Sequence, residues 1–259
     1  MLLASDLFTR DGLGQFLFRW LHVLAGITWI GLLYFFNVVQ VPAYAQFEQS
    51  PNEAIGGKAR LIAIDKVTRK ALWWFRWAAV GTFLTGIIIV GLTKEYFSSS
   101  PGWANAAILT GMLLGTIMLL NVWGVIWRCQ KVVLANAANV LAGGQPNPDA
   151  AVAGRRAVMA SRQNTIFSVS MLWFMVLRGH GAVAYGLSNL GAGKGFAYWI
   201  IVLAIIAVLE LNCLGLLPWK TAPNKGLNAL YDGPGVRNPI IAAFGLWAVF
   251  LILGEIFFS

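Results

Sequence analysis

Long apolar runs separated by short charged stretches dominate the pattern of this 259-residue chain. A helix needs roughly 20 mostly apolar residues to cross about 30 Å of hydrocarbon. Six segments meet this requirement and are predicted to be transmembrane helices: 15–46, 71–92, 104–127, 163–187, 195–217 and 239–258. No hydrophilic block long enough for a soluble domain separates them. Residues 1–259 are therefore expected to form one all-α integral membrane domain, a bundle of about six helices.

Lysine and arginine gather in alternate loops, and this bias predicts the orientation of the bundle. Thirteen of the 19 basic residues precede the second, fourth and sixth predicted helices, and only five lie on the other side. Cytoplasmic loops of membrane proteins carry the excess of Lys and Arg. Both termini are therefore predicted to lie outside, in the periplasm of a Gram-negative bacterium, with the chain crossing the cytoplasmic (inner) membrane several times. Residues 52–70, with charges at helical spacing, are expected to extend the second helix into the cytoplasm.

Composition and charge exclude several classes of protein. The chain is 58% hydrophobic and 11% charged, whereas a soluble domain carries about 25% charged residues. The net charge of +9 is explained by the loops, so membrane lipid is the expected surrounding and no nucleic-acid partner is expected. The cysteines, Cys129 and Cys213, form no CxxCH motif, which excludes a covalently attached c-type haem on this chain.

The first predicted helix carries an unusual stripe of polar residues. On a helical wheel nearly all of its strongly polar side chains share one arc of about 80°; these are Gln15, Arg19, His22, Asn37 and Gln40. Polar groups at membrane depth are costly and usually face the bundle interior. The stripe is therefore expected to face protein, a cofactor or water rather than lipid.

The two histidines of the chain are predicted to share the outer leaflet. His22 lies one or two turns below the outer surface, and His180 ends the fourth predicted helix on the same side. Two neutral imidazoles can bind a b-type haem axially, or hold a metal ion together with Glu255 from the sixth helix. The alternative is that each histidine only forms hydrogen bonds between helices or at the interface.

A second polar group is expected in the inner leaflet. It contains Arg76, Asn121 and Glu210, with Asn37 reaching the same depth from the first helix. An Arg76–Glu210 ion pair would offset the desolvation of both charges, which is a purely structural role. The functional alternative is a pocket for an anionic substrate, in which the guanidinium clamps the anion and the amides supply donors and acceptors.

Four segments are similar to the membrane-bound urate hydroxylase family, whose membrane part is called the urate oxidase N-terminal domain. They are WLHVLAGITWIGLLYFFN at 20–37, ALWWFRWAA at 71–79, NVWGVIWRCQK at 121–131 and SRQNTIFSVSMLWFM at 161–175. The resemblance implies a purine-catabolic oxidoreductase that converts urate to 5-hydroxyisourate and passes electrons to a cytochrome c. Family members commonly carry that cytochrome as a fused C-terminal domain. No CxxCH follows the sixth segment here, so a cytochrome c acting in trans is expected.

The first helix also resembles two looser groups through His22, Trp29 and Gly31. These are the haem-binding protoporphyrinogen oxidase membrane family and the copper-resistance membrane proteins, and the resemblance implies that His22 binds haem or a metal. The leading hypothesis is a urate hydroxylase-type enzyme with a catalytic group drawn from Arg76, Asn37, Asn121 and Glu210. The alternative is a non-catalytic haem-binding or structural subunit of a larger respiratory or photosynthetic complex. An anion transporter is less favoured, because the helices lack paired Gly/Pro interruptions.

Overall fold

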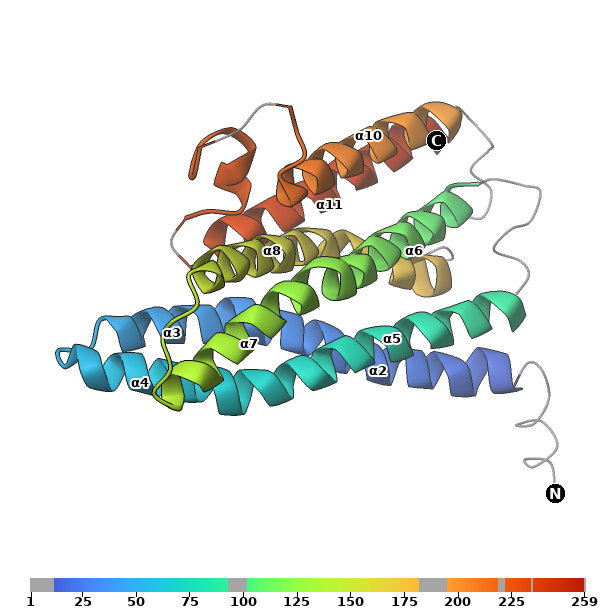
Figure 1. Cartoon of the computed structure of the whole chain (residues 1–259). Helices are drawn as coiled ribbons and strands as arrows, with labels where there is room; N and C mark the ends of the chain where they lie inside the picture. The colour runs from blue at the N-terminus through green and yellow to red at the C-terminus, as the bar shows by residue number, and fades with distance from the viewer. Residues whose placement is uncertain (1–11, 93–101, 182–194, 219–221, 234, 259) are drawn as a thin grey trace, which may run out of the picture.

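The protein is a bundle of long helices (Figure 1). The structure, a computed structural model, describes residues 12–92, 102–181, 195–218, 222–233 and 235–258, and every regular element in those ranges is helical. Five helices are long and apolar enough to cross a membrane: Phe18–Glu48, Glu53–Leu92, Trp103–Leu141, Gly195–Leu214 and Arg237–Phe258. The all-helical prediction is confirmed, and the molecule is compatible with a multi-pass membrane protein.

The first three long helices contain short π-helical stretches but run without a break. The first comprises η1 (Gly12–Leu17), α2 (Phe18–Tyr34), η2 (Phe35–Gln40) and α3 (Val41–Glu48). The second comprises α4 (Glu53–Ala63), η3 (Ile64–Thr68) and α5 (Arg69–Leu92). The extension predicted over 52–70 is therefore helical, and its cytoplasmic location stays a prediction. The third comprises α6 (Trp103–Asn121), η5 (Val122–Ile126) and α7 (Trp127–Leu141). Its predicted end at 127 was wrong, because helix-forming residues continue the helix beyond the apolar run.

Glycines mark the ends of two helices. Gly143 has a φ of 88° and follows α7, and Gly215 has a φ of 70° and follows α10 (Gly195–Leu214). At the second site Leu216 N–H donates to Leu211 O at 2.9 Å, the bond of a Schellman motif. The helix predicted to reach 217 therefore ends three residues earlier.

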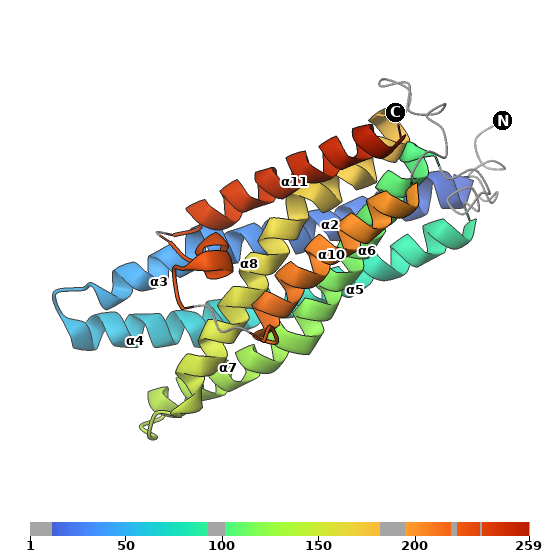
Figure 2. The same ribbon diagram turned by 90° about the horizontal axis from the view of Figure 1, so that it is seen from above.

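Helix α8 (Asp149–Val176), followed by η6 (Leu177–Gly181), lies in the middle of the bundle. It packs against α2, α6, α7, α10 and α11 (Arg237–Phe258), and Figure 2 shows it running among them. The segment predicted as a membrane helix over 163–187 begins much earlier, at Asp149, and 182–187 lie outside the described residues. Unlike the five helices that are apolar enough to cross a membrane, α8 is not apolar along its length, because its central turns carry buried polar side chains. These are Arg162, Gln163, Asn164, Thr165, Ser168 and Ser170.

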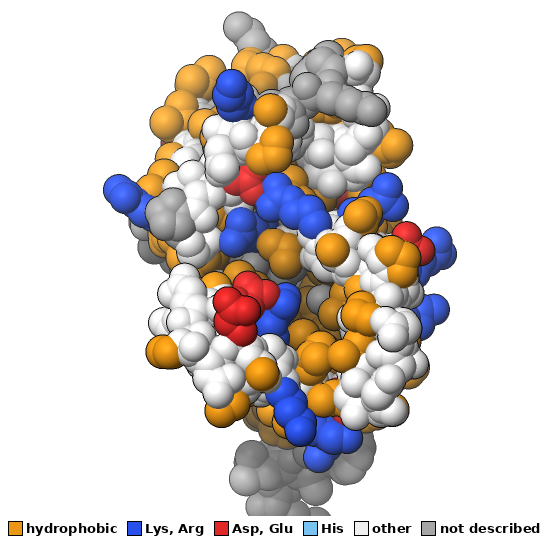
Figure 3. Space-filling model, turned by 60° about the vertical axis from the view of Figure 1, so that its left-hand side comes forward, with side chains coloured by type: hydrophobic (Ala, Val, Ile, Leu, Met, Phe, Trp, Pro, Cys, Tyr) orange, Lys and Arg blue, Asp and Glu red, His pale blue; other side chains and the backbone are white. Residues whose placement is uncertain are grey.

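The two described ends of the chain, Gly12 and Phe258, lie at the same end of the bundle (Figure 1). The α3–α4 turn, the α7–α8 turn and the α10–α11 loop, which contains η8 (Gly226–Leu230), lie at the opposite end. Figure 3 looks toward that opposite end, where Lys and Arg side chains are spread over the surface. The basic loops predicted to share one side of the membrane are therefore on one side of the molecule.

Candidate functional site

His22 faces α5 across a close helix–helix contact. Its Nδ1 lies 2.8 Å from Thr82 O and 3.2 Å from Thr85 Oγ1. A backbone carbonyl can only accept, so this contact requires the proton on Nδ1 and leaves the lone pair on Nε2. A Cβ added at Gly86 would lie 3.2 Å from His22 Cε1, so glycine allows the imidazole to approach α5 closely. The ring is oriented by the protein in the way that metal- and haem-binding histidines usually are.

The described residues do not bring His22, His180 and Glu255 together as a group of three ligands, and a metal bound by the two histidines stays a prediction. The described residues include no group of three His, Cys, Asp or Glu side chains that could hold a metal ion. His180 is exposed in η6, and the Glu255 carboxylate accepts a hydrogen bond from Trp103 Nε1 at 3.1 Å. Glu255 therefore has a partner within the bundle that the sequence did not reveal. A haem held by His22 and His180 stays a prediction.

The polar stripe of the first helix is divided between two neighbouring helices. Gln40 Oε1 accepts a hydrogen bond from Thr68 Oγ1 at 2.9 Å, so it faces the second long helix as His22 does. Asn37 Nδ2 donates to Ser161 Oγ on α8 at 2.7 Å and to Leu33 O at 2.9 Å. These side chains contact protein, as expected of polar groups at membrane depth.

Arg76 has no carboxylate partner in the part of the chain that the structure describes. Among the ion pairs of the described residues none contains Arg76, so the predicted pair with Glu210 was wrong. Its guanidinium carbon lies 3.7 Å from the Trp127 ring centroid and 5.9 Å from that of Trp123. Arg76 Nε and Trp123 Nε1 are both buried without a hydrogen-bond acceptor. The reason for the difference is that Arg76 on α5 faces the junction of η5 and α7, whereas Glu210 lies on α10.

Asn121 and Glu210 do meet, as the inner-leaflet group predicted. Asn121 Nδ2 lies 3.2 Å from Glu210 Oε2 and 3.1 Å from Asn164 Oδ1. Asn164 Nδ2 in turn donates to Met118 O at 2.9 Å. This chain of hydrogen bonds joins α10, α6 and α8. Asn37 and Arg76, which were grouped with it from the sequence, have other partners.

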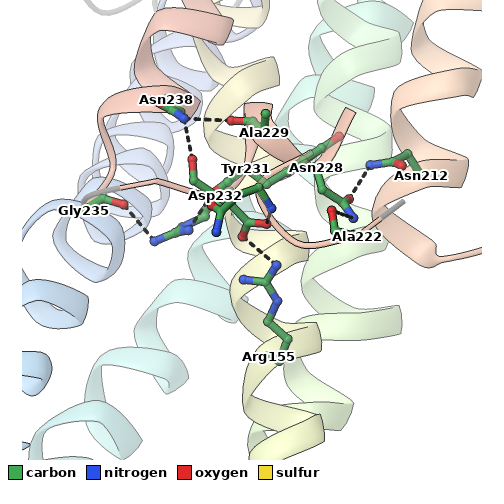
Figure 4. A network of polar contacts seen from close by, with 11 residues as sticks. Arg155, Asn212, Ala222, Asn228, Ala229, Tyr231, Asp232, Gly235 and Asn238 are labelled. Atoms are coloured by element: carbon green, nitrogen blue, oxygen red, sulfur yellow. Dashed lines mark hydrogen bonds and ion pairs between the residues drawn. The ribbon is translucent and has the colours of Figure 1, made fainter. Parts of the chain in front are cut away.

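Sequence reasoning missed a polar network that ties the α10–α11 loop to α8 (Figure 4). Arg162 donates to the carbonyl oxygens of Tyr231 and Gly235, and Arg155 Nη2 lies 2.6 Å from Asp232 Oδ1. The Tyr231 hydroxyl is fully buried and contacts Gln163 Oε1 and Leu209 O. Arg162 had been treated as a loop charge. The sequence did contain a signal for this network, the polar run Arg162–Gln163–Asn164 at the start of an apolar segment. Such a run can lie in a membrane helix only if protein contacts pair its polar groups.

Asp232 is the buried acid of this network. Burial by itself raises the pKa of its carboxyl, but the Asn224 N–H, the hydrogen bond from Arg155 and the positive charges of Arg155 and Arg162 outweigh that effect. The pKa of Asp232 is therefore below its ordinary value of 3.8. The carboxylate stays ionised and holds the loop against α8.

No family model, curated protein or solved structure matches this chain. The resemblance to the urate hydroxylase family therefore stays an expectation based on its four segments. The geometry identifies three candidate centres of chemistry. These are the Arg76 guanidinium stacked on two tryptophans, the oriented imidazole of His22, and the Glu210 carboxyl with its amide partners.

Proposed function

We propose that the chain is a membrane redox protein of the urate hydroxylase type, which binds a planar anionic purine beside Arg76. The observation that carries this proposal is the Arg76 guanidinium, which has no ion-pair partner among the described residues. Arg76 stacks on Trp127, and both Arg76 Nε and Trp123 Nε1 lack an acceptor. Buried donors without partners are costly, and an anion with several acceptor atoms would satisfy them.

The chemistry of the Arg76 centre suits a flat heteroaromatic anion. Urate carries ring nitrogens and carbonyl oxygens in one plane, so a guanidinium can bind it through parallel N–H bonds. The indole of Trp123 offers one further N–H, and its ring could stack on a flat ligand. The Trp127 ring holds the guanidinium by a cation–π contact and fixes its plane. Asn121 lies two residues before Trp123 on the third long helix, but its amide N–H groups already bond Asn164 and Glu210.

His22 supports the redox part of the proposal. With Nδ1 bonded to Thr82 O, its Nε2 is free to bind haem iron, so the side chain fits that group. Haem at this position would supply one-electron transfer. The protein's own contribution is to set the imidazole tautomer and orientation through Thr82 and the close approach to Gly86. We assign the electron acceptor to a cytochrome c outside the membrane.

The proposed topology has six crossings, with α8 as the fourth and both termini outside the cytoplasm. Two observations support it. The basic loops lie at one end of the bundle and the described chain ends at the other. The polar side chains of α8 are buried among other helices, so this helix could cross the membrane without exposing them to lipid. The corresponding location is a bacterial cytoplasmic membrane.

Replacing Arg76 with glutamine is expected to weaken urate binding by about 100-fold, since a charge-assisted bidentate contact is worth roughly 3 kcal/mol. Arg76→Lys should restore little of the urate binding, because an ammonium lacks the planar pair of N–H donors that a guanidinium has. Binding is measured by equilibrium dialysis with the chain in nanodiscs, and turnover by urate loss with added cytochrome c. Arg156→Gln, at an exposed arginine on α8, is the control. The proposal is contradicted if the wild-type protein neither binds urate nor consumes it with any cytochrome c acceptor.

A non-catalytic haem-binding subunit is the second candidate, and the orientation of His22 is the observation that favours it. The purified chain is then expected to show a Soret band that shifts on reduction and is lost in His22→Ala. His180→Ala should also lose it if both imidazoles bind the iron. Gln40→Ala, which removes a polar group of the same helix, should keep the band. A colourless wild-type protein after reconstitution with haem excludes this role.

A further inference from the structure

Helices α6 and α10 enclose a groove that the urate proposal does not use. Its volume is about 410 Å³, and it is lined by Leu113, Ile117, Leu203, Ile206, Ala207, Glu210 and Leu211. Figure 2 shows the two helices running alongside each other. The groove opens at the surface of the bundle, so a molecule dissolved in the bilayer could enter it from the side.

The groove is polar at one end only. Leu203, Ala207 and Glu210 follow one another along α10, and Leu113 and Ile117 follow one another along α6 one turn apart. Asn121, one turn beyond Ile117, is bonded to Glu210. The groove therefore runs from a carboxyl and an amide near the basic end of the bundle to purely apolar walls farther along. This arrangement fits a ligand with an oxygen-bearing head and an apolar tail.

Glu210 has one oxygen available to such a ligand. Asn121 Nδ2 donates a hydrogen bond to Oε2 and another to Asn164 Oδ1 on α8. The position of the carboxyl is therefore set by two successive hydrogen bonds. No ion pair of the described residues includes Glu210. An ionised carboxylate without a cation is costly in hydrocarbon, so the neutral acid is favoured there. A neutral acid can donate an O–H to a ligand carbonyl and accept from a ligand hydroxyl.

The charge of the groove restricts the head group. No Lys or Arg lines it, and its only ionisable group is an acid, so a phosphate-bearing head is disfavoured. A hydrocarbon chain alone would leave the free oxygen of Glu210 unpaired. A neutral ring with carbonyl or hydroxyl oxygens and an apolar tail satisfies both conditions. We propose that the α6–α10 groove binds the head of a lipid-soluble quinone or quinol, with Glu210 as the hydrogen-bonding partner of a ring oxygen.

The test uses the full chain in nanodiscs of neutral phospholipid, with decylubiquinone as the probe. Dicyclohexylcarbodiimide, an apolar reagent that adds to protonated carboxyls, is expected to modify Glu210, and decylubiquinone is expected to slow that modification. Mass spectrometry of the modified peptide follows both effects. Modification that proceeds at the same rate with saturating decylubiquinone, or no modification of Glu210, overturns the proposal.

Two variants separate the groove from non-specific partition into lipid. Glu210→Gln should weaken saturable decylubiquinone binding about tenfold, because one hydrogen bond to the acid is replaced by a poorer one. Ile117→Phe should abolish it by filling the groove, whereas Leu120→Phe, on the same helix but 63% exposed, should not. Equal binding by wild type and Ile117→Phe contradicts the proposal. Urate binding is not part of these measurements, so this inference and the urate proposal can fail separately.

Discussion

Replacing Gly254 with alanine is expected to destabilise the bundle by about 2–3 kcal/mol, because one added methyl would overpack a site that has no room for it. A Cβ at this position would lie 1.9 Å from Trp103 Cζ2 and 2.0 Å from Cη2. Glycine is otherwise unfavourable in a helix by about 1 kcal/mol relative to alanine. Alanine would gain this amount in helix propensity, so the variant is destabilised only if the steric cost of the added methyl is larger. The sign of the change in stability therefore tests the packing directly.

The Trp103 ring cannot easily move away from such a methyl. It is fully buried, stacked on Phe258 at a centroid distance of 5.6 Å and edge-on to Tyr198 and Phe174. Its Nε1 is also bonded to Glu255, one residue after Gly254. Any shift of the indole would disturb an aromatic cluster that joins α6, α8, α10 and α11.

The loss is measured by unfolding the purified protein with sodium dodecyl sulfate in mixed micelles and following tryptophan fluorescence. Gly245→Ala is a matched control, because it lies on the same helix and a Cβ there has nothing within 4 Å. The control should be neutral or slightly stabilised. Equal stability of the two variants would show that α6 and α11 do not pack in this way.

Asp232→Ala is expected to cost about 2 kcal/mol, since it removes the acceptor of the Asn224 N–H and the ion-pair partner of the half-exposed Arg155. Asp232 is 4% exposed and bonds both Arg155 and the Asn224 N–H. Without it, Arg155 and the buried Arg162 would repel each other beside an unpaired backbone N–H. Asp149→Ala is the control, because that exposed acid begins α8 and contributes only a helix-terminus effect of about 0.5 kcal/mol. Loss of equal size in both variants would contradict the role of the network.

The same carboxylate predicts a pH dependence with a definite sign. The pKa of Asp232 is lower in the folded protein than in the unfolded chain. Its contribution to the free energy of unfolding is therefore fully present above the ordinary value of 3.8 and is lost as the pH falls through the lower folded pKa. In that acidic range wild type should lose stability more steeply than Asp232→Ala. Parallel curves would show that Asp232 is not the group responsible.

The chain's pattern was sufficient to determine its helical class and the approximate course of its long helices. Apolar runs of membrane-spanning length and helix-ending glycines such as Gly215 are local signals, which do not depend on which helices become neighbours. The same holds for the hydrogen bonds of Asn37 and Gln40 to other helices, because polar groups at membrane depth need protein partners in any arrangement. The sequence also predicted that Asn121 and Glu210 lie at one depth in the membrane, and in the structure their side chains are hydrogen-bonded.

Only the tertiary structure decided which partner each polar group meets. Depth along a helix follows from residue number, but the direction toward a neighbour depends on helix order and rotation, which hydropathy does not determine. Arg76 and Glu210 were predicted to lie at one depth, yet they face different helices, so one stacks on Trp127 and the other lines the α6–α10 groove. The polar centre of α8 was likewise unexpected, because a central helix pairs its polar groups with surrounding helices and need not look apolar.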